Sequence, residues 1–249
     1  MTMILTSLVE KKENNLKSLS ILIDPDKIKN QKSLGNLLDI CEKFNVDFIF
    51  IGGSLLVNDT LNETVSYVKN NSEIPVILFP GSILHIDKSA DAILFLSLIS
   101  GRNPDLLIGQ HVAAAPVLKN STLEILSTGY ILVGNDANTT VAHISQTFPI
   151  PTQKTEIAVC TAIAGEMLGM KLIYLDAGSG AKEEVPQDMI AQVKKSINIP
   201  LIVGGGIDTT AKANIAYQSG ADMIVLGTSV EKNVAFVSEV AKLRDQMNS

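Results

Sequence analysis

The feature that most constrains this chain is a regular alternation of short apolar runs with windows of helix length. The runs are rich in Val, Ile and Leu and almost continuous, which is typical of parallel strands buried on both faces. Strands are expected near 18–24, 47–52, 75–79, 91–97, 129–133, 172–176, 200–204 and 222–227, and helices over 29–44, 56–70, 105–126, 154–169, 186–197, 209–219 and 229–246. Eight strands in this order predict an α/β fold, a (βα)8 TIM barrel.

The length and composition fit one barrel domain spanning residues 1–249. A TIM barrel commonly needs about 250 residues and does not divide at that size. Hydrophobic residues make up 46% of the chain, aromatic residues only 4%, and tryptophan is absent. The core is therefore expected to be aliphatic.

Two connections depart from the βα rhythm. Only residues 80–90 separate the third and fourth strands, and Pro80-Gly81-Ser82 opens this segment, so we expect an extended segment in place of the third helix. Residues 134–155 form a long polar stretch after the fifth strand, and residues 139–145 within it could pair as a short extra strand. Such a loop would emerge at the catalytic end of a barrel, either as a substrate cover or as a subunit contact.

Charge and hydropathy exclude several classes of protein. The formal charge is −6, which argues against a nucleic-acid partner, because a phosphate-backbone footprint needs clustered Lys and Arg. No apolar run approaches the ~18 residues of a spanning helix, and the first residues lack a signal-peptide pattern. Cys41 and Cys160 lie in apolar helical patterns, where inert buried thiols are expected. These features predict a soluble cytoplasmic protein.

Three glycine-rich turns follow strands near the C-terminus: residues 176–180, 204–206 and 227–229. Glycine leaves backbone N–H groups unobstructed, and helix N-termini behind the turns add positive dipole ends. Turns after the last strands of a barrel are a common phosphate site. We expect a phosphate ester as ligand.

The tips of the first two strands carry oxygen ligands. Asp24-Pro25-Asp26 ends the first strand, and Ser54 follows Gly52 and Gly53 at the end of the second. One or two carboxylates together with substrate phosphates commonly hold Mg²⁺. The alternative is structural, because Asp-Pro-Asp also begins turns and caps helices.

Several motifs occur together in the order seen in one enzyme family. They are Asp24-Pro-Asp-Lys27, Phe50-Ile-Gly-Gly-Ser54, Gly109-Gln-His111, Gly129-Tyr-Ile-Leu132, Tyr174-Leu-Asp-Ala-Gly-Ser-Gly-Ala181, Gly204-Gly-Gly-Ile207 and Gly227-Thr228. From about residue 18 to about residue 235 the chain resembles the geranylgeranylglyceryl phosphate synthase family, which includes bacterial heptaprenylglyceryl phosphate synthases. The glycine turns are shared with many phosphate-binding barrels, whereas the first and fifth motifs together are much more specific.

The resemblance implies a modified barrel without its third helix and a specific reaction. The 3-hydroxyl of sn-glycerol 1-phosphate attacks C1 of a polyprenyl diphosphate, forming an ether and releasing pyrophosphate with the help of Mg²⁺. The metal ligands implied are Asp24 and Ser54. The glycerol phosphate site implied comprises Tyr174, Leu175, Asp176, Ala177, Gly178, Ser179, Gly180, Gly204, Gly205, Gly206, Gly227 and Thr228. Family relatives form dimers or larger assemblies, so a homo-oligomer is expected.

Asp176 is the candidate general base. The attacking hydroxyl must lose its proton as the ether forms, and a carboxylate beside the glycerol site can accept it. Many family members carry glutamate here, and aspartate is one methylene shorter. The structural alternative is that Asp176 only caps the turn that follows it.

The polyprenyl chain requires a long apolar groove. Phe79, Leu84, Phe95, Leu96 and Leu98 are candidate lining residues, although each would also serve as ordinary barrel core. We expect a geranylgeranyl rather than a heptaprenyl chain. Without a basic amphipathic stretch, at most transient membrane contact is expected.

Two other classes of function stay open at this point. One is a phosphosugar isomerase or aldolase, which would share the glycine turns but needs an acid–base pair or a Schiff-base lysine inside the barrel. No strand has an obvious interior lysine. The other is a non-catalytic phosphate-binding barrel.

Overall fold

The computed structural model describes residues 3–135 and 139–249. Its centre is a closed barrel of eight parallel strands in chain order, in which β1 pairs with both β2 and β8. The strands are β1 (Ser18–Ile23), β2 (Phe48–Gly53), β3 (Val76–Pro80), β4 (Ala92–Leu98), β5 (Glu124–Leu132), β6 (Leu172–Asp176), β7 (Leu201–Gly204) and β8 (Met223–Leu226). The predicted TIM barrel is confirmed.

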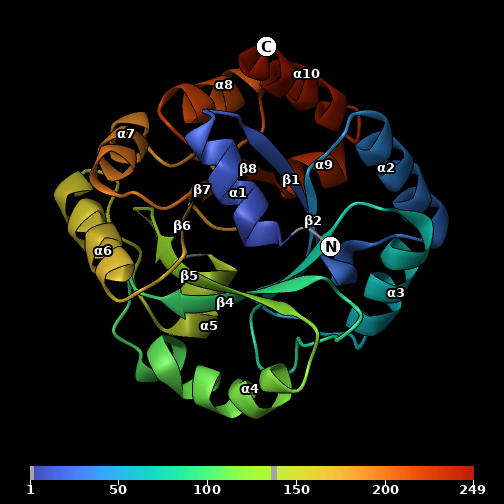
Figure 1. Cartoon of the computed structure of the whole chain (residues 1–249), viewed down its shortest axis with the longest axis horizontal. Coiled ribbons are helices and arrows are strands. Elements are labelled where there is room, and N and C mark those ends of the chain that lie inside the picture. Colours follow the sequence, from blue (N-terminus) through green and yellow to red (C-terminus); the bar gives the residue numbers. More distant parts are fainter. Residues whose placement is uncertain (1–2, 136–138) are drawn as a thin grey trace.

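Helices form a ring around the barrel (Figure 1). They are α1 (Ile4–Glu13), α2 (Gln31–Lys43), α3 (Leu61–Asn71), α4 (Gln110–Lys119), α5 (Thr140–Ser145), α6 (Thr155–Met167), α7 (Gln187–Ser196), α8 (Thr210–Gln218), α9 (Thr228–Lys232) and α10 (Phe236–Asn248). A 3₁₀ turn (Pro25–Lys27) follows β1, and a π-helical turn (Asp105–Gly109) precedes α4. Residues 81–91, between β3 and β4, contain no helix, as the short third crossover predicts.

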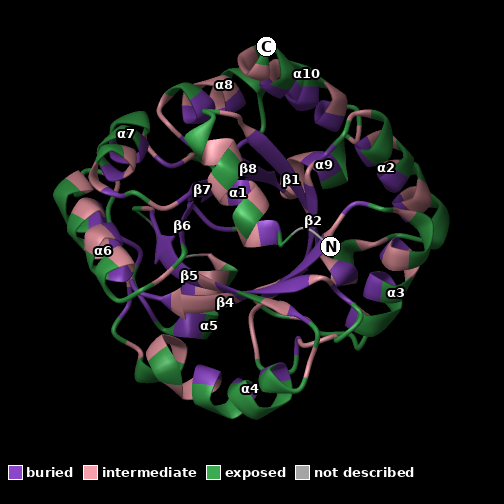
Figure 2. Cartoon of the chain, viewed as in Figure 1, coloured by how far each residue is buried: buried purple, intermediate pink, exposed green. Residues whose placement is uncertain are grey.

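The apolar core has two layers. One fills the barrel interior, where Phe50, Leu94 and Tyr174 are buried, and the other lies between the strands and the helices. Figure 2 shows the strands mostly buried, with intermediate stretches in β4 and β5, and the helices exposed on their outer faces. Helix α1 lies across one end of the barrel in Figure 1. Its first N–H groups donate to the Glu124 carboxylate at the start of β5, which caps this helix.

Two predicted helices differ from the structure. The helix predicted over 105–126 extends too far at its C-terminal end, because α4 ends at Lys119. Residues from Glu124 onward instead belong to β5 and pair with β4 along its whole length. The run Leu123-Glu-Ile-Leu126 suits a helix or a strand equally, and strand pairing decides between them. The window 229–246 is two helices, α9 and α10, separated at Asn233.

Two local predictions are also wrong. Residues 139–145 do not form a strand, because Thr139 caps the N-terminus of helix α5 by accepting from the Ala142 N–H at 3.3 Å. Residues 136–138 of the same stretch lie outside the described residues. Cys160 is exposed, because α6 buries the opposite face, which carries Ala158 and Ala162. Cys41 is buried as expected, and burial raises the pKa of its thiol to about 12.

Among the described residues, no helix is both long enough and apolar enough to cross a lipid bilayer.

Candidate active site

Two cavities lie at the end of the barrel where the strands terminate. The first, a polar compartment, has about 1410 Å³ of empty space and is lined by the tips of β1, β2, β6, β7 and β8. The second, an apolar groove, has about 870 Å³ of empty space and runs along β3, β4 and α4. Gly53, Ser54 and Phe79 line both cavities. The two cavities therefore meet at the ends of β2 and β3.

The glycine turns form one wall of the polar compartment. Gly178, Gly180, Gly205 and Gly206 all have positive φ, between 69° and 93°, which L side chains rarely adopt. A Cβ on Gly205 would lie 2.6 Å from Asp176 Oδ1, so only glycine lets these two turns approach. The N–H groups of Ser179, Gly180, Gly205, Gly206 and Thr228 have no acceptor among the described residues. This wall can hold an anion.

Asp176 ends β6 and is buried in the wall of the polar compartment, with 7% of its surface exposed. Tyr130 Oη donates to Oδ2 at 2.5 Å, and the Gly178 N–H donates to Oδ1 at 2.8 Å. No Lys or Arg pairs with this carboxylate among the described residues. Burial raises the pKa of Asp176, although both hydrogen bonds oppose that shift. Such a group is poised to accept a proton.

The two aspartates at the tip of β1 have different environments. Asp26 accepts from the Val57 and Asn58 N–H groups, which lower its pKa and fix the loop after β2. Asp24 Oδ1 accepts from the Asp26 N–H at 3.1 Å, whereas Oδ2 faces Lys27 Nζ at 3.2 Å. The expectation of two available carboxylates is thus reduced to one, because Asp26 is occupied by backbone donors.

Asp24 faces the tip of β2. A Cβ on Gly53 would lie 3.8 Å from Asp24 Oδ2, and Ser54 is the next residue along the chain. No cluster of three or more His, Cys, Asp or Glu side chains suited to a metal occurs in the described part of the chain. A cation bound here would have one protein carboxylate and would need further oxygen ligands from substrate and water.

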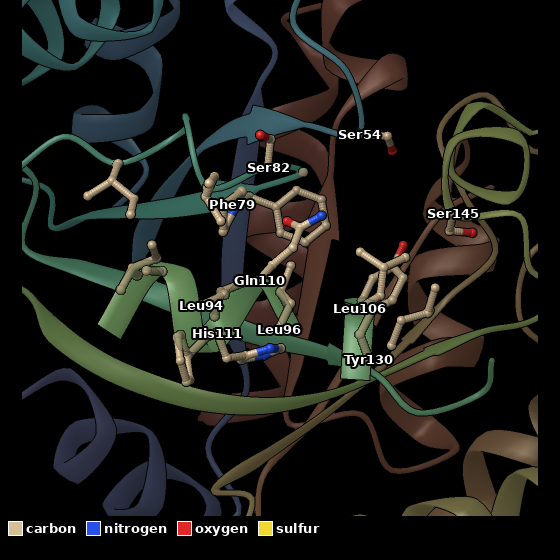
Figure 3. Close-up of a pocket in the computed structure, with 18 of the residues that line it drawn as sticks. Ser54, Phe79, Ser82, Leu94, Leu96, Leu106, Gln110, His111, Tyr130 and Ser145 are labelled. Carbon is tan, nitrogen blue, oxygen red and sulfur yellow. The ribbon is translucent and has the colours of Figure 1, made fainter. Parts of the chain in front are cut away.

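The apolar groove follows α4 away from the compartment. Gln110, Ala114 and Leu118 line it from successive turns of α4, and Leu106 lines it from the π-helical turn before that helix. Phe79, Leu94 and Leu96 line it from the strands (Figure 3). Of the predicted lining residues, Phe79, Phe95, Leu96 and Leu98 face this groove. Leu84 does not, because its side chain points outward and is 82% exposed.

His111 serves packing and hydrogen bonding at this groove. Its Nε2 lies 3.1 Å from Ser97 Oγ, and Phe95 contacts its ring edge-to-face with centroids 4.4 Å apart. Burial lowers the pKa of His111, so the ring is neutral at physiological pH. These contacts give His111 a structural role in the wall of the groove.

The loop after β5 contributes to both cavities. Thr140 lines the polar compartment, and Val141, Ile144 and Ser145 line the groove. All four lie on helix α5. Of the two roles considered for this loop, this position favours a substrate cover.

Most of the predicted site residues come together in the polar compartment, and three do not. Those that line it are Asp24, Ser54, Tyr174, Asp176, Gly178, Ser179, Gly180, Gly205, Gly206, Gly227 and Thr228. Leu175 and Ala177 belong to the core layer between strands and helices, because alternate strand residues face opposite sides. Gly204 lies beneath the wall, where a Cβ would approach Tyr174 Oη to 2.5 Å.

Tyr130 is the functional side chain that the sequence did not single out. It lies in the motif Gly129-Tyr-Ile-Leu132, but nothing in the spacing indicates that β5 places its phenol on Asp176 of β6. The register pairs Tyr130 with Tyr174, two residues before Asp176 on the same inward face. A strand alignment was needed to find this contact.

Comparisons with known proteins agree with this geometry. The profile of the PcrB family matches residues 11–244. Geranylgeranylglyceryl phosphate synthase of Spirosoma linguale is 50% identical over 244 residues, covering 98% of each chain, and that of Chitinophaga pinensis is 49% identical, covering 96% of this chain and 94% of the relative. The crystal structure of (S)-3-O-geranylgeranylglyceryl phosphate synthase from Thermoplasma acidophilum, in complex with its substrate sn-glycerol-1-phosphate, superposes with a TM-score of 0.91 at 33% identity. It covers 100% of this chain and 99% of that structure. The chain therefore belongs to the PcrB family, among whose relatives are geranylgeranylglyceryl phosphate synthases.

Proposed function

We propose that this protein is a geranylgeranylglyceryl phosphate synthase. It joins O3 of sn-glycerol 1-phosphate to C1 of geranylgeranyl diphosphate, forming an ether and releasing pyrophosphate. The observation that carries this proposal is a glycine-walled polar compartment that opens directly into a long apolar groove. A substrate pair with two charged ends and one long apolar tail would fill both cavities. The names of the relatives and the ligand of the Thermoplasma structure support the same reaction.

The phosphate of the glycerol substrate binds at the glycine wall. The backbone N–H groups of Gly180, Gly205 and Gly206 supply donors, and Thr228 begins α9 behind them. A phosphate held here leaves its glycerol arm between Tyr174 and Asp176, the two inward side chains at the end of β6. The glycerol hydroxyls then face the junction with the groove.

Asp176 accepts the proton of the attacking hydroxyl. A base works best when its pKa approaches the working pH, and burial moves the pKa of this carboxyl in that direction. The short hydrogen bond from Tyr130 fixes one carboxylate oxygen and orients the group. The structural alternative, a cap on the following turn, is also present in the Gly178 contact, so Asp176 has both roles.

We propose that Mg²⁺ accompanies the diphosphate and is held by Asp24 and Ser54. The donor set fits, because Asp24 and Ser54 line the same compartment, and Mg²⁺ typically takes one or two carboxylates plus phosphate and water. Asp24 Oδ2 now pairs with Lys27, which Mg²⁺ would displace. Five acidic side chains line the compartment, namely Asp24, Asp26, Asp176, Asp208 and Glu231. Among the described residues, the cations that line it are Lys27 and Lys232. A diphosphate entering this acidic site requires a counter-cation. When bound, Mg²⁺ would stabilise negative charge on the leaving group.

The length of the groove favours a geranylgeranyl chain. Gln110 and Leu118 both line it from α4, and a helix rise of 1.5 Å per residue makes their separation about 12 Å. Leu106, in the π-helical turn before α4, extends this lining. An extended chain advances about 1.2 Å per bond, so the main chain of a C20 prenyl group spans about 19 Å and that of a C35 group about 34 Å. The shorter chain matches.

The two alternative functions have less support. A Schiff-base mechanism needs a lysine inside the barrel, and the lysines that line the compartment in the described chain, Lys27 and Lys232, lie beyond the ends of β1 and β8. A non-catalytic phosphate-binding protein would have no use for an unpaired buried Asp176 or for the groove.

The test is pyrophosphate release from geranylgeranyl diphosphate with Mg²⁺, comparing sn-glycerol 1-phosphate, sn-glycerol 3-phosphate and no acceptor. We expect release only with the 1-phosphate and Mg²⁺, and faster release with the C20 than with the C35 diphosphate. Absence of release with every acceptor and chain length would reject the proposed reaction.

A further inference from the structure

Phe79 occupies the junction between the two cavities. It lies in β3, near the end of the strand. Like Gly53 and Ser54, it lines both the polar compartment and the apolar groove. Gly53 has no side chain and Ser54 carries a hydroxyl. Phe79 is therefore the aromatic side chain at the junction. Figure 3 draws it among the residues around the groove.

Neighbouring rings hold Phe79 in place. Phe50 of β2 lies nearly parallel to it, with centroids 6.3 Å apart and an interplanar angle of 21°. Tyr130 and Tyr174 contact it in tilted arrangements, with centroids at 6.1 Å and 5.7 Å. Phe79 is 8% exposed, and this remaining surface borders the two cavities. Its position is thus fixed before any substrate binds.

The backbone confirms that this placement is specific. Gly52 is paired with Phe79 across the β2–β3 ladder, and a Cβ on Gly52 would lie 2.2 Å from the Phe79 carbonyl oxygen. Any other residue at position 52 would push the end of β3 away from β2. Gly52 therefore sets the position of Phe79 next to Ser54.

The reacting carbon must pass this point. This step of the argument rests on the proposed function, in which the diphosphate lies in the polar compartment and the prenyl chain in the groove. C1 joins these two parts, so it lies at the junction, beside Phe79. The bond from C1 to the diphosphate oxygen breaks with its electron pair leaving on pyrophosphate. The bond from glycerol O3 to C1 forms, and the O3 proton passes to Asp176.

We propose that Phe79 is a further catalytic residue, whose ring contacts the allylic C1–C3 unit and stabilises the positive charge that develops there during transfer. The face of an aromatic ring carries negative electrostatic potential and attracts a cation within about 6 Å of its centroid. The interaction is stronger in the transition state than with the neutral ground-state chain, which is what accelerates a reaction. An aliphatic wall would give the same shape without this stabilisation.

The experiment replaces Phe79 with ring-fluorinated phenylalanines by nonsense suppression. Mono-, di- and trifluorinated rings keep almost the same size while progressively weakening the negative potential of the face. Single-turnover ether formation is measured for each, together with the Kd of an unreactive geranylgeranyl thiodiphosphate. The matched control places the same series at Phe48, which is buried in the barrel interior, lines neither cavity and makes no ring contact with Phe79.

We expect the rate of ether formation to fall stepwise with fluorination at Phe79, reaching a loss of about tenfold, with Kd unchanged. In the Phe48 series we expect neither the rate of ether formation nor Kd to change. Phe79→Leu shows a loss of similar size. Equal rates across the Phe79 series in an active enzyme would overturn the catalytic role and leave the proposed function intact. Absence of ether formation in the unmodified enzyme would instead overturn the proposed function, and this inference with it.

Discussion

The two ends of the barrel use aspartate in opposite ways. At the end where strands begin, Asp47, Asp91 and Asp222 each directly precede a strand and accept a backbone N–H from the neighbouring strand. Each also pairs with cations: Asp47 with Arg244 and Lys11, Asp91 with Lys69, and Asp222 with Lys194. Every one of these buried charges is matched.

At the end where strands terminate, Asp176 is buried without a cation among the described residues. Its partners are a phenol and one backbone N–H. A buried charge without an opposite charge costs stability, which explains why the pKa of Asp176 is raised by burial. The same residue type therefore carries a paired charge at one end of the barrel and, in the proposed function, supplies the base at the other. In TIM barrels generally, these ends serve stability and catalysis respectively.

The largest effect expected is on the reaction at the unmatched carboxylate. Asp176→Asn keeps the size of the side chain and removes the base, so kcat should fall by about 10² to 10⁴-fold. The raised pKa means that ionising Asp176 costs more free energy in the folded protein than in the unfolded chain. The free energy of unfolding therefore declines as the pH rises from the pKa of Asp176 in the unfolded chain to its higher pKa in the folded protein.

Asp176→Asn should therefore melt at a higher temperature than the wild type at neutral pH, with no such gain at a pH below the ordinary carboxyl pKa of about 3.9. Steady-state kinetics and thermal unfolding measure the two effects on one sample. Full activity in this variant would remove Asp176 from the mechanism, and a lower melting temperature at neutral pH would contradict the cost assigned to its charge.

A loss of stability is expected at the end of the barrel where the strands begin. Asp222→Ala leaves Lys194 and the Leu201 N–H without their acceptor and should lower the free energy of unfolding by about 2–3 kcal/mol. Denaturant unfolding measures the loss, and kcat at a temperature where the variant is folded should be unchanged. The matched control is Glu156→Gln, whose exposed contact with Lys154 at 4.0 Å should change stability by less than about 0.5 kcal/mol. The comparison breaks if the two variants lose equal stability.

A smaller effect is expected at the proposed metal site. Ser54→Ala removes one neutral oxygen ligand, so the Mg²⁺ concentration that gives half-maximal rate should rise by about threefold to tenfold, a loss of about 1 kcal/mol. The KM for sn-glycerol 1-phosphate, measured at saturating Mg²⁺, is the internal control and should stay the same. An unaltered Mg²⁺ requirement would exclude the Ser54 hydroxyl as a ligand.

Much of this molecule could be predicted from the sequence. The strands are apolar on both faces, so their runs are nearly continuous and their positions agree with the structure within a few residues, except at the start of β5. The glycine turns and Asp24 stand at strand ends, where sequence position alone places them in one compartment. The absence of a helix between β3 and β4 follows from the short segment after Pro80.

Side-chain partners could not be predicted in the same way. The contact between Tyr130 and Asp176 depends on the β5–β6 register, and the different roles of Asp24 and Asp26 depend on which one the loop at Val57 covers. Helix α5 follows from a local cap at Thr139, whereas the start of β5 depends on its pairing with β4. One signal was available and unused: Asp47, Asp91 and Asp222 each sit between a small or branched apolar residue and the first residue of a strand.

The most direct test of the contrast between matched and unmatched carboxylates is the pH dependence of kcat/KM in the wild type and in Tyr130→Phe. The control is Tyr217→Phe, which removes a buried hydroxyl that donates to the Ser18 carbonyl at the start of β1. In the wild type we predict that kcat/KM falls toward low pH, and that the midpoint of this acidic limb lies above the ordinary aspartate pKa of about 3.9. Because the Tyr130 hydrogen bond lowers the pKa of Asp176, its removal should move this limb to higher pH, whereas Tyr217→Phe should leave it in place. The ionisation of the substrate phosphate is common to all three enzymes and cancels in the comparison. An acidic limb at the same pH in the wild type and Tyr130→Phe would contradict the assignment of Asp176 as the unmatched, functional carboxylate.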